Sequence, residues 1–143
     1  MAAHRTTEYA VCALVVLALE KGGGKIQQAA ALARSSGTPP KFMEQVLRLL
    51  GKGGFVVSRR GAGGGYELAR APERIRLGEV VSWMEGIAER AIGDGAPSRE
   101  WKILRDKAEA ARRAVLEKET LLDLAEKVQQ RMAVRGRGSE YQI

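Results

Sequence analysis

Segment 61–65 holds four glycines in five positions, with two arginines before it and Tyr66 after it. Short runs of residues that favour β-strands flank it at 55–58 and 66–69. Glycine tolerates positive φ and lets the backbone approach another molecule closely, so this run predicts the tip of a two-stranded hairpin. The two arginines, Arg59 and Arg60, suit contact with a phosphate backbone.

The glycine run has two other interpretations. A loop that cradles a nucleotide follows a strand, opens a helix and carries a lysine in register, whereas this run continues as a strand and has no such lysine. A flexible surface turn is the simpler alternative, and the run taken alone does not exclude it. The charge and the predicted elements of the rest of the chain distinguish between a surface turn and a binding element.

The positive charge of the chain is concentrated in its first half. The net charge is +7, and residues 1–70 hold ten Lys and Arg against four Asp and Glu, whereas residues 71–143 hold fourteen against thirteen. We therefore expect the half with the hairpin to bind a polyanion. The basic residues are spread over several predicted elements, which favours nucleic acid over a membrane surface, because a membrane-binding helix gathers them on one face.

The composition argues against several classes of protein. No apolar run approaches the roughly 20 residues of a membrane span, and no secretory signal opens the chain, so we expect a cytoplasmic protein without a membrane partner. Cys12 is the only cysteine, which excludes an internal disulfide and a multi-cysteine metal site within one chain. No paired carboxylates or nucleophile–base arrangement suggest catalysis. The sequence thus predicts no enzyme activity, no metal and no cofactor.

The first predicted helix spans residues 6–21. Every residue from 9 to 19 is apolar, so this helix should be buried on nearly all sides. Thr6 or Thr7 can serve as its N-cap. Cys12 lies within it and is expected to be a packed thiol, because free cysteine behaves as a small hydrophobic residue.

A second, short helix is predicted at 27–35, ending at Gly37. Pro39 and Pro40 suit the first turn of a third helix, with Thr38 as the possible cap. Apolar residues spaced i, i+3, i+4 and i+7 give the third helix a core face, made of Met43, Val46, Leu47 and Leu50. Its opposite face is polar and consists of Lys41, Glu44, Gln45 and Arg48.

A polar helix face is most often only solvated. In a helix-turn-helix, however, the outward face of the second helix enters the major groove of DNA. There Arg and Lys can pair with guanine and Gln with adenine, while Glu can accept from cytosine. Three helices followed by a basic, glycine-tipped hairpin predict a winged helix-turn-helix that binds double-stranded DNA. The wing is then expected to contact the DNA through Arg59, Arg60 and the backbone amides of Gly61, Gly63 and Gly64.

Beyond the wing, one helix carries an apolar stripe of Leu77, Val80, Val81 and Met84, which Trp83 extends. A loop at 92–97 leads to a long helix, with Ser98 as its cap. The long helix has apolar residues at 3-4-3-4 spacing, a coiled-coil seam made of Trp101, Leu104, Ala108, Ala111 and Val115. So narrow a seam can pack either on its own domain or on a second copy of the chain.

The long helix is expected to break near Lys118. Thr120 and Asp123 resemble a capping box, with Asp in place of the usual Glu or Gln, and start a final helix. The inner face of that helix is predicted to hold Leu121, Leu124, Ala125, Val128 and Met132. The tail at 133–143 is basic and glycine-rich, and we expect it to be loose.

Motifs in four predicted elements match those of one known family. They are Glu8-Tyr9-Ala10-Val11, Pro40-Lys41-Phe42-Met43-Glu44-Gln45, Arg60-Gly61-Ala62-Gly63-Gly64-Gly65-Tyr66 and Leu77-Gly78-Glu79-Val80-Val81. Over residues 5–132 the chain resembles the Rrf-two family of bacterial winged-helix transcription regulators, and the wing motif is the most specific part of the match. The resemblance implies a homodimer built on the long helix, and a repressor.

The chain departs from this family in three places. Cluster-binding members hold three cysteines between the helix after the wing and the dimer helix, and residues 86–98 contain none. An iron–sulfur cluster needs thiolate ligands, so the chain resembles the cluster-free members. Ala62 stands where proline is usual at the wing tip, and Pro39 stands where a capping serine is usual. These two changes leave the fold alone and bear on which DNA sequence is read.

The signal that the chain responds to stays open in the sequence. A small ligand, a partner protein and oxidation of Cys12 are the alternatives. Trp83, Met84 and Trp101 are candidates for lining a small-molecule pocket, although core packing is their simpler role.

The predicted fold is mainly α with a small two-stranded β-wing. A winged helix-turn-helix domain at 1–90 is followed by a cysteine-free loop at 91–97, a dimerisation helix and a short packing helix at 98–132, and a flexible basic tail at 133–143. The predicted function is a homodimeric, sequence-specific regulator that represses from a pseudo-palindromic operator. The alternative is a winged-helix module that binds protein, which Lys41 and Arg48 on the outward face argue against.

Overall fold

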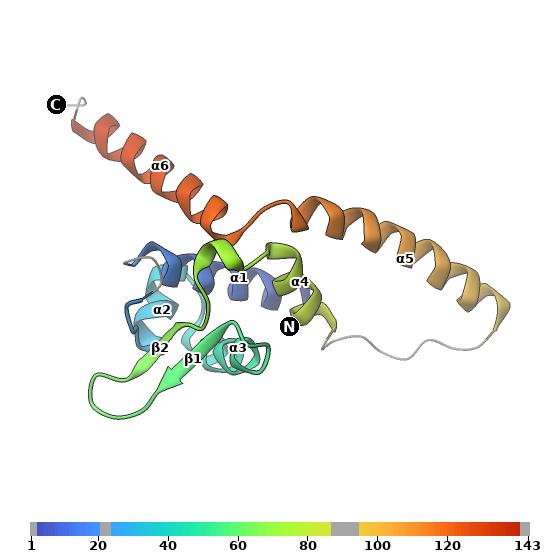
Figure 1. The fold of residues 1–143 in the computed structure, drawn as a ribbon, viewed down its shortest axis with the longest axis horizontal. Helices are drawn as coiled ribbons and strands as arrows, with labels where there is room; N and C mark the ends of the chain where they lie inside the picture. The colour runs from blue at the N-terminus through green and yellow to red at the C-terminus, as the bar shows by residue number, and fades with distance from the viewer. Residues whose placement is uncertain (1–2, 21–23, 87–94, 141–143) are drawn as a thin grey trace.

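The protein is represented by a computed structural model that describes residues 3–20, 24–86 and 95–140. Its elements are α1 (Ala3–Leu19), α2 (Ala29–Ser36), α3 (Pro40–Lys52), β1 (Val56–Arg59), β2 (Gly65–Leu68), the 3-10 helix η2 (Pro72–Arg74), α4 (Leu77–Gly86), α5 (Ala96–Glu117) and α6 (Leu121–Glu140). The two strands pair antiparallel, and helices make up most of the rest (Figure 1). The predicted fold class, mainly α with a two-stranded wing, is confirmed.

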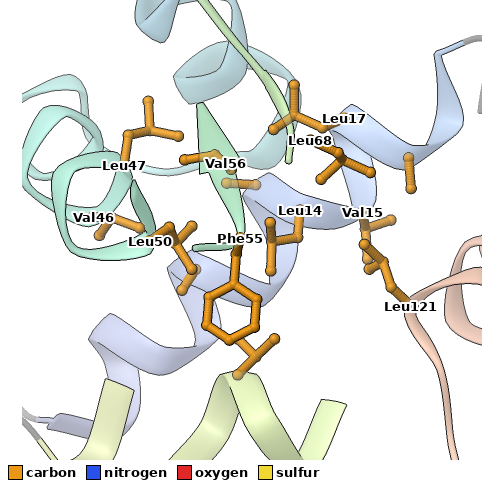
Figure 2. Packing of buried hydrophobic residues seen from close by; sticks show 14 of the residues in the cluster. Leu14, Val15, Leu17, Val46, Leu47, Leu50, Phe55, Val56, Leu68 and Leu121 are labelled. Atoms are coloured by element: carbon orange, nitrogen blue, oxygen red, sulfur yellow. The ribbon is translucent and has the colours of Figure 1, made fainter. Parts of the chain in front are cut away.

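Helix α1 lies at the centre of the fold. It packs against α2, α3, α4, α6 and strand β2, and no side chain from Tyr9 to Leu19 is exposed, as its unbroken apolar sequence predicted. Figure 2 shows Leu14 of α1 near Phe55 and Leu50, and Val15 beside Leu121 of α6. The largest fully buried side chains are Leu14, Leu17, Leu32, Met43, Leu47, Leu50, Ile75 and Leu121.

Three predicted helix caps are wrong. Helix α1 begins at Ala3, so Thr6 and Thr7 lie inside it. Helix α3 takes Pro39 as its N-cap, without a side-chain hydrogen bond, whereas Thr38 is buried in the preceding turn. Helix α5 begins at Ala96, ahead of Ser98, because Pro97 fits the first turn of a helix. A residue that can serve as an N-cap does not fix the start of a helix when the residues before it can also adopt a helical conformation.

The junction between α5 and α6 is fastened to the body of the domain. The Leu77 amide donates to the Glu119 carbonyl (3.1 Å), and the Leu121 amide donates to the Ile75 carbonyl (2.8 Å). The predicted break is confirmed, since α5 ends at Glu117. The capping box is confirmed as well: the Thr120 amide donates to Asp123 Oδ2 (2.9 Å), and the Asp123 amide donates to Thr120 Oγ1 (3.1 Å).

Helix α6 is longer than the sequence predicted. It continues to Glu140 through the segment that was expected to be loose from 133 on. Two interior glycines, at 136 and 138, weaken a helix by about 1 kcal/mol each without forcing it to end. Met132 is exposed rather than on the inner face, because the body of the domain covers only the first turns of α6, around Leu121 and Ala125.

The capping box predicts a loss of stability in acid. The hydrogen bond from the Thr120 amide, and then the one with the Thr120 side chain, hold the pKa of Asp123 below its ordinary value of 3.8. Since folding lowers this pKa, the carboxylate stabilises the fold above the unfolded-state value, and that contribution is lost as the pH falls through the folded-state value. Asp123→Asn should therefore lower the Tm at neutral pH, and thermal melts of variant and wild type should converge in strong acid. An equal Tm difference at both pH values would contradict this assignment.

Candidate nucleic-acid interface

The α2–α3 unit turns one face of α3 to solvent. The turn between the helices is held by the Thr38 amide, which donates to the Ala33 carbonyl (3.0 Å), and by the Ser36 hydroxyl, which donates to the Leu32 carbonyl (2.6 Å). The four predicted core residues of α3, Met43, Val46, Leu47 and Leu50, are 0% exposed. The four predicted reading residues are all exposed, namely Lys41, Glu44, Gln45 and Arg48. The predicted division of α3 into two faces is confirmed, and base reading by the outer face stays a prediction.

The start of α3 is supported by α1. The ring of Phe42 stacks on that of Tyr9, with centroids 6.2 Å apart and an interplanar angle of 18°. Lys41 Nζ lies 5.0 Å from the centroid of the Phe42 ring, close enough for a cation–π contact. The charge of Lys41 therefore rests at the beginning of α3, beside the turn that joins it to α2.

The other cation of the α3 face, Arg48, is further along the helix. Within the described part of the chain, neither Lys41 nor Arg48 belongs to a salt bridge. Both charges are exposed and can pair with phosphate or with guanine without first breaking an ion pair.

The hairpin forms as a regular wing. Val56 pairs with Leu68 and Arg59 with Gly65, which leaves residues 60–64 as the loop. Arg59 Nε donates to Glu67 Oε1 across the hairpin (2.8 Å), so the charge of Arg59 is already shared within the wing. Arg60 is exposed and has no ion pair among the described residues. Arg60 is therefore the stronger of the two predicted phosphate contacts.

The wing glycines are required by the hairpin itself. A Cβ on Gly64 would collide with the Arg59 carbonyl oxygen, and a Cβ on Gly65 would collide with that of Gln27. Gly61 and Gly63 have positive φ values, 99° and 78°. The Gly64 amide donates to the Gly61 carbonyl (2.9 Å). This amide is therefore already hydrogen-bonded within the turn and is not free to donate to a phosphate while that bond is formed. The predicted contacts of Gly61, Gly63 and Gly64 with DNA stay predictions.

Gln27 is a residue of the wing that the sequence did not reveal. Its amide donates to the Tyr66 carbonyl, and the Tyr66 amide donates to the Gln27 carbonyl, both at 2.8 Å. Gln27 thus forms an isolated antiparallel bridge with Tyr66 of β2. Because the next residue, Gln28, is the N-cap of α2, the bridge connects β2 to the start of that helix. Among the described residues Gln27 Nε2 is buried without a hydrogen-bond partner. No periodicity signals a single bridged residue, which is why only the structure shows it.

Helix α5 carries its apolar seam on the outside of the chain. Trp101 is 58% exposed, Leu104 60% and Val115 67%, and Ala108 and Ala111 are exposed as well. Ile103 is a further exposed apolar residue outside the predicted seam. None of the α5 residues is buried, and Figure 1 shows the helix extending away from the domain. The seam therefore does not pack on its own domain, and its partner stays a prediction.

The three proposed pocket residues occupy three different environments. Met84 is buried in the core, and Trp83 packs against the core and hydrogen-bonds to α3. Trp101 is exposed on α5. Core packing is confirmed for Met84 and Trp83, and these residues give no support to a ligand pocket.

Cys12 is half-buried in α1. Burial, followed by the nearby carboxylate of Glu8, raises the pKa of its thiol. A raised pKa keeps the sulfur protonated and unreactive, as expected for a packed thiol.

Within the described residues, no group of three or more His, Cys, Asp or Glu side chains is placed to hold a metal ion. Of the helices described, none combines the length and apolar character needed to cross a membrane.

Comparisons with known proteins agree with this geometry. The family model Rrf2 (Rrf-two), described as an iron-dependent transcriptional regulator, matches residues 3–127. A Mycobacterium tuberculosis protein that is named as an HTH-type transcriptional regulator is 37% identical to this chain over 129 residues. The match covers 82% of this chain and 77% of that protein. The HTH-type regulator CymR of Bacillus subtilis is 31% identical over 121 residues, covering 82% and 84%.

Solved structures show the same similarity in three dimensions. The structure of CymR, the global cysteine regulator of B. subtilis, superposes with a TM-score of 0.66 at 29% identity, covering 85% of this chain and 94% of that one. The structure of T. potens IscR superposes with a TM-score of 0.64 at 28% identity, covering 86% and 85%.

The iron dependence in the family description does not fit the residues of this chain. A cluster or a thiolate-bound iron needs several cysteines, whereas Cys12 is the only one. The match over residues 3–127 nevertheless spans the helix-turn-helix, the wing and α5. This chain is a transcriptional regulator with a winged helix-turn-helix and belongs to the Rrf2 family.

Proposed function

We propose that the chain acts as a homodimer that reads a pseudo-palindromic DNA operator and represses transcription from it. The observation that carries this proposal is the sharp division of α3. Its inner face is fully buried, and its outer face presents Lys41, Glu44, Gln45 and Arg48. This set of side chains can donate to guanine, pair with adenine and accept from cytosine. An acidic or apolar outer face would instead favour a protein partner.

In this proposal, each subunit inserts α3 into a major groove. Arg48 and Gln45 reach base edges, and Lys41 enters the groove at the start of the helix. Two backbone hydrogen bonds between Gln27 and Tyr66 tie the wing to the residue that precedes the N-cap of α2, which restrains the wing relative to the helix-turn-helix. Arg60 then meets a phosphate that flanks the site, and Arg59 contributes less because Glu67 shares its charge.

The exposed seam of α5 supports the homodimer. Three large apolar side chains on one helix, Trp101, Leu104 and Val115, are each more than half exposed in the single chain. A second copy of α5 with the same heptad spacing would cover them. Two-fold symmetry of the dimer implies two half-sites about one or two turns of duplex apart. A bound dimer would block access to a promoter, and a small molecule or partner protein would release it in the cytoplasm.

In vitro selection from random DNA tests this function. The wild-type protein should enrich a site with two inverted half-sites, and footprinting should show protection on both. Light scattering should give the mass of a dimer. Enrichment of no sequence, with equal binding to all duplexes, would mean that the chain does not read DNA.

The wing makes a separate, electrostatic prediction. Arg60→Ala should weaken binding to all sequences and reduce the slope of log K against log salt by about one, because one phosphate contact is lost. The slope can be measured by fluorescence anisotropy over a salt series. Lys118→Ala is the matched control, since it removes one exposed charge at the end of α5, away from the wing. An unchanged slope for Arg60→Ala would remove this residue from the interface.

Removing iron should leave DNA binding unchanged. The chain lacks the cysteine thiolates that a cluster needs, so a chelator should have no cluster iron to remove. Protein purified with and without a strong chelator should bind the selected site with equal affinity, and neither sample should show visible absorbance. A loss of binding in chelator that ferrous iron restores would contradict this expectation.

A further inference from the structure

Trp83 of α4 reaches the last turn of α3. Its Nε1 donates a hydrogen bond to the Leu49 carbonyl oxygen, with a separation of 2.8 Å. The same oxygen accepts from the Gly53 amide at 3.1 Å, which closes the end of the helix. Leu49 directly follows Arg48, so the indole holds the backbone next to one of the proposed reading residues.

The chain makes room for this indole at Gly53. The φ value of Gly53 is −80°, which any residue can adopt, so backbone conformation does not require glycine there. A Cβ at this position would lie 2.7 Å from Trp83 Nε1 and 2.8 Å from its Cδ1, as well as 2.9 Å from Phe55 Cε2. The absence of a side chain therefore lets Trp83 lie directly against the backbone at the end of α3.

Helix α4 is also the element that α5 packs against. Glu85, two residues after Trp83, pairs with Arg112 of α5, and Arg112 also binds Glu109 (3.1 Å). At the other end of α4, a Cβ on Gly78 would lie 2.5 Å from Cγ of Glu117. Helix α4 thus contacts α5 near both of its ends, and Trp83 extends from it to α3.

We propose that Trp83 is a positioning residue that fixes the last turn of α3 for base reading and couples it to the placement of α5. The Leu49 carbonyl oxygen already accepts from the Gly53 amide, and a carbonyl oxygen has two lone pairs, so the indole N–H is a second donor that further restrains the turn. Base contacts depend on displacements well below 1 Å, and the side chain beside the restrained turn is Arg48. The inference rests on the proposed DNA reading, and it makes α4 the link between dimer helix and reading helix.

Two variants test the positioning role. Trp83→Phe removes the N–H donor, and Gly53→Ala places a Cβ against the indole at a φ of −80°, which alanine also adopts. Each should reduce affinity for the site selected by the wild type about tenfold, the equivalent of roughly one hydrogen bond, and leave affinity for a random duplex of equal length unchanged. Val80→Ala, a buried change on the same helix, should lower the Tm and leave the ratio of the two affinities as in the wild type.

Arg112→Gln tests the coupling to α5. It should also lower the ratio of specific to random affinity, and the double variant with Trp83→Phe should be no worse than Trp83→Phe alone. Additive losses would overturn the coupling, and an unchanged ratio in both Trp83→Phe and Gly53→Ala would overturn the positioning role. If the wild type selects no site at all, the proposed function fails instead, which separates the two outcomes.

Discussion

Leu104→Asp in α5 should convert the dimer to a monomer and lower affinity for the selected operator by about a hundredfold or more, because a monomer holds only one half-site. In the single chain Leu104 is 60% exposed, so the change should leave the Tm of the domain nearly unaltered. In the dimer the same position would be covered by the partner, and two-fold symmetry would bury two unpaired carboxylates.

The control for this experiment lies on the same helix. Ala110 is exposed on the side of α5 away from the seam, so Ala110→Asp introduces the same charge where no partner helix is expected. Light scattering and operator titration of the two variants give the answer. A Leu104→Asp protein that stays dimeric with full affinity would show that the seam is not the interface between subunits.

Arg48→Ala should cost about 1–3 kcal/mol in binding to the selected site, which is the value of one bidentate base contact. Gln45→Ala should have an effect of similar size at a different base pair. Both residues are exposed, so their removal should not destabilise the fold. Competition with single-base variants of the site identifies the contact, because the variant protein should no longer discriminate at that position.

Arg113→Ala is a suitable comparison for Arg48→Ala, since it removes another exposed arginine, from α5. It should leave both specific and random affinities close to those of the wild type. An Arg48→Ala protein that loses equally on the selected site and on random DNA would contact phosphate and would not read a base.

Periodicity predicted the parts of the fold in which many residues repeat one pattern. The spacing of Met43, Val46, Leu47 and Leu50 identified the buried face of α3, and it thereby identified the exposed face as well. The seam of α5 was located by the same reasoning, whereas its spacing alone left open whether it packs on its own domain or on a second copy. The capping box at Thr120 and Asp123 was also readable, since two reciprocal hydrogen bonds require two residue types at a fixed separation.

Helix ends were predicted less well. Thr6, Thr38 and Ser98 can each cap a helix, yet α1, α3 and α5 begin at other positions. A cap contributes about 1 kcal/mol, so packing of the neighbouring residues readily shifts the boundary by a turn. The extension of α6 to Glu140 could not be inferred from its glycines, which penalise a helix without excluding it.

Contacts between single residues that are distant in the chain could not be predicted from the sequence. The wing glycines have the same signature whether they serve DNA or the hairpin, and only the positions of the Arg59 and Gln27 carbonyls show that the hairpin needs them. The bond from Trp83 to Leu49 joins residues 34 positions apart, and no repeat or motif marks it. Such contacts arise from how the elements pack, after their own patterns are satisfied.

We propose that this regulator reads DNA sequence through the exposed face of α3. The most direct test is the affinity of the wild-type protein for its selected site and for a scrambled duplex of the same length, at the same salt. Specific binding is expected to be at least about a thousandfold tighter, as for sequence-reading regulators in general. Equal affinities for the two duplexes would contradict the claim.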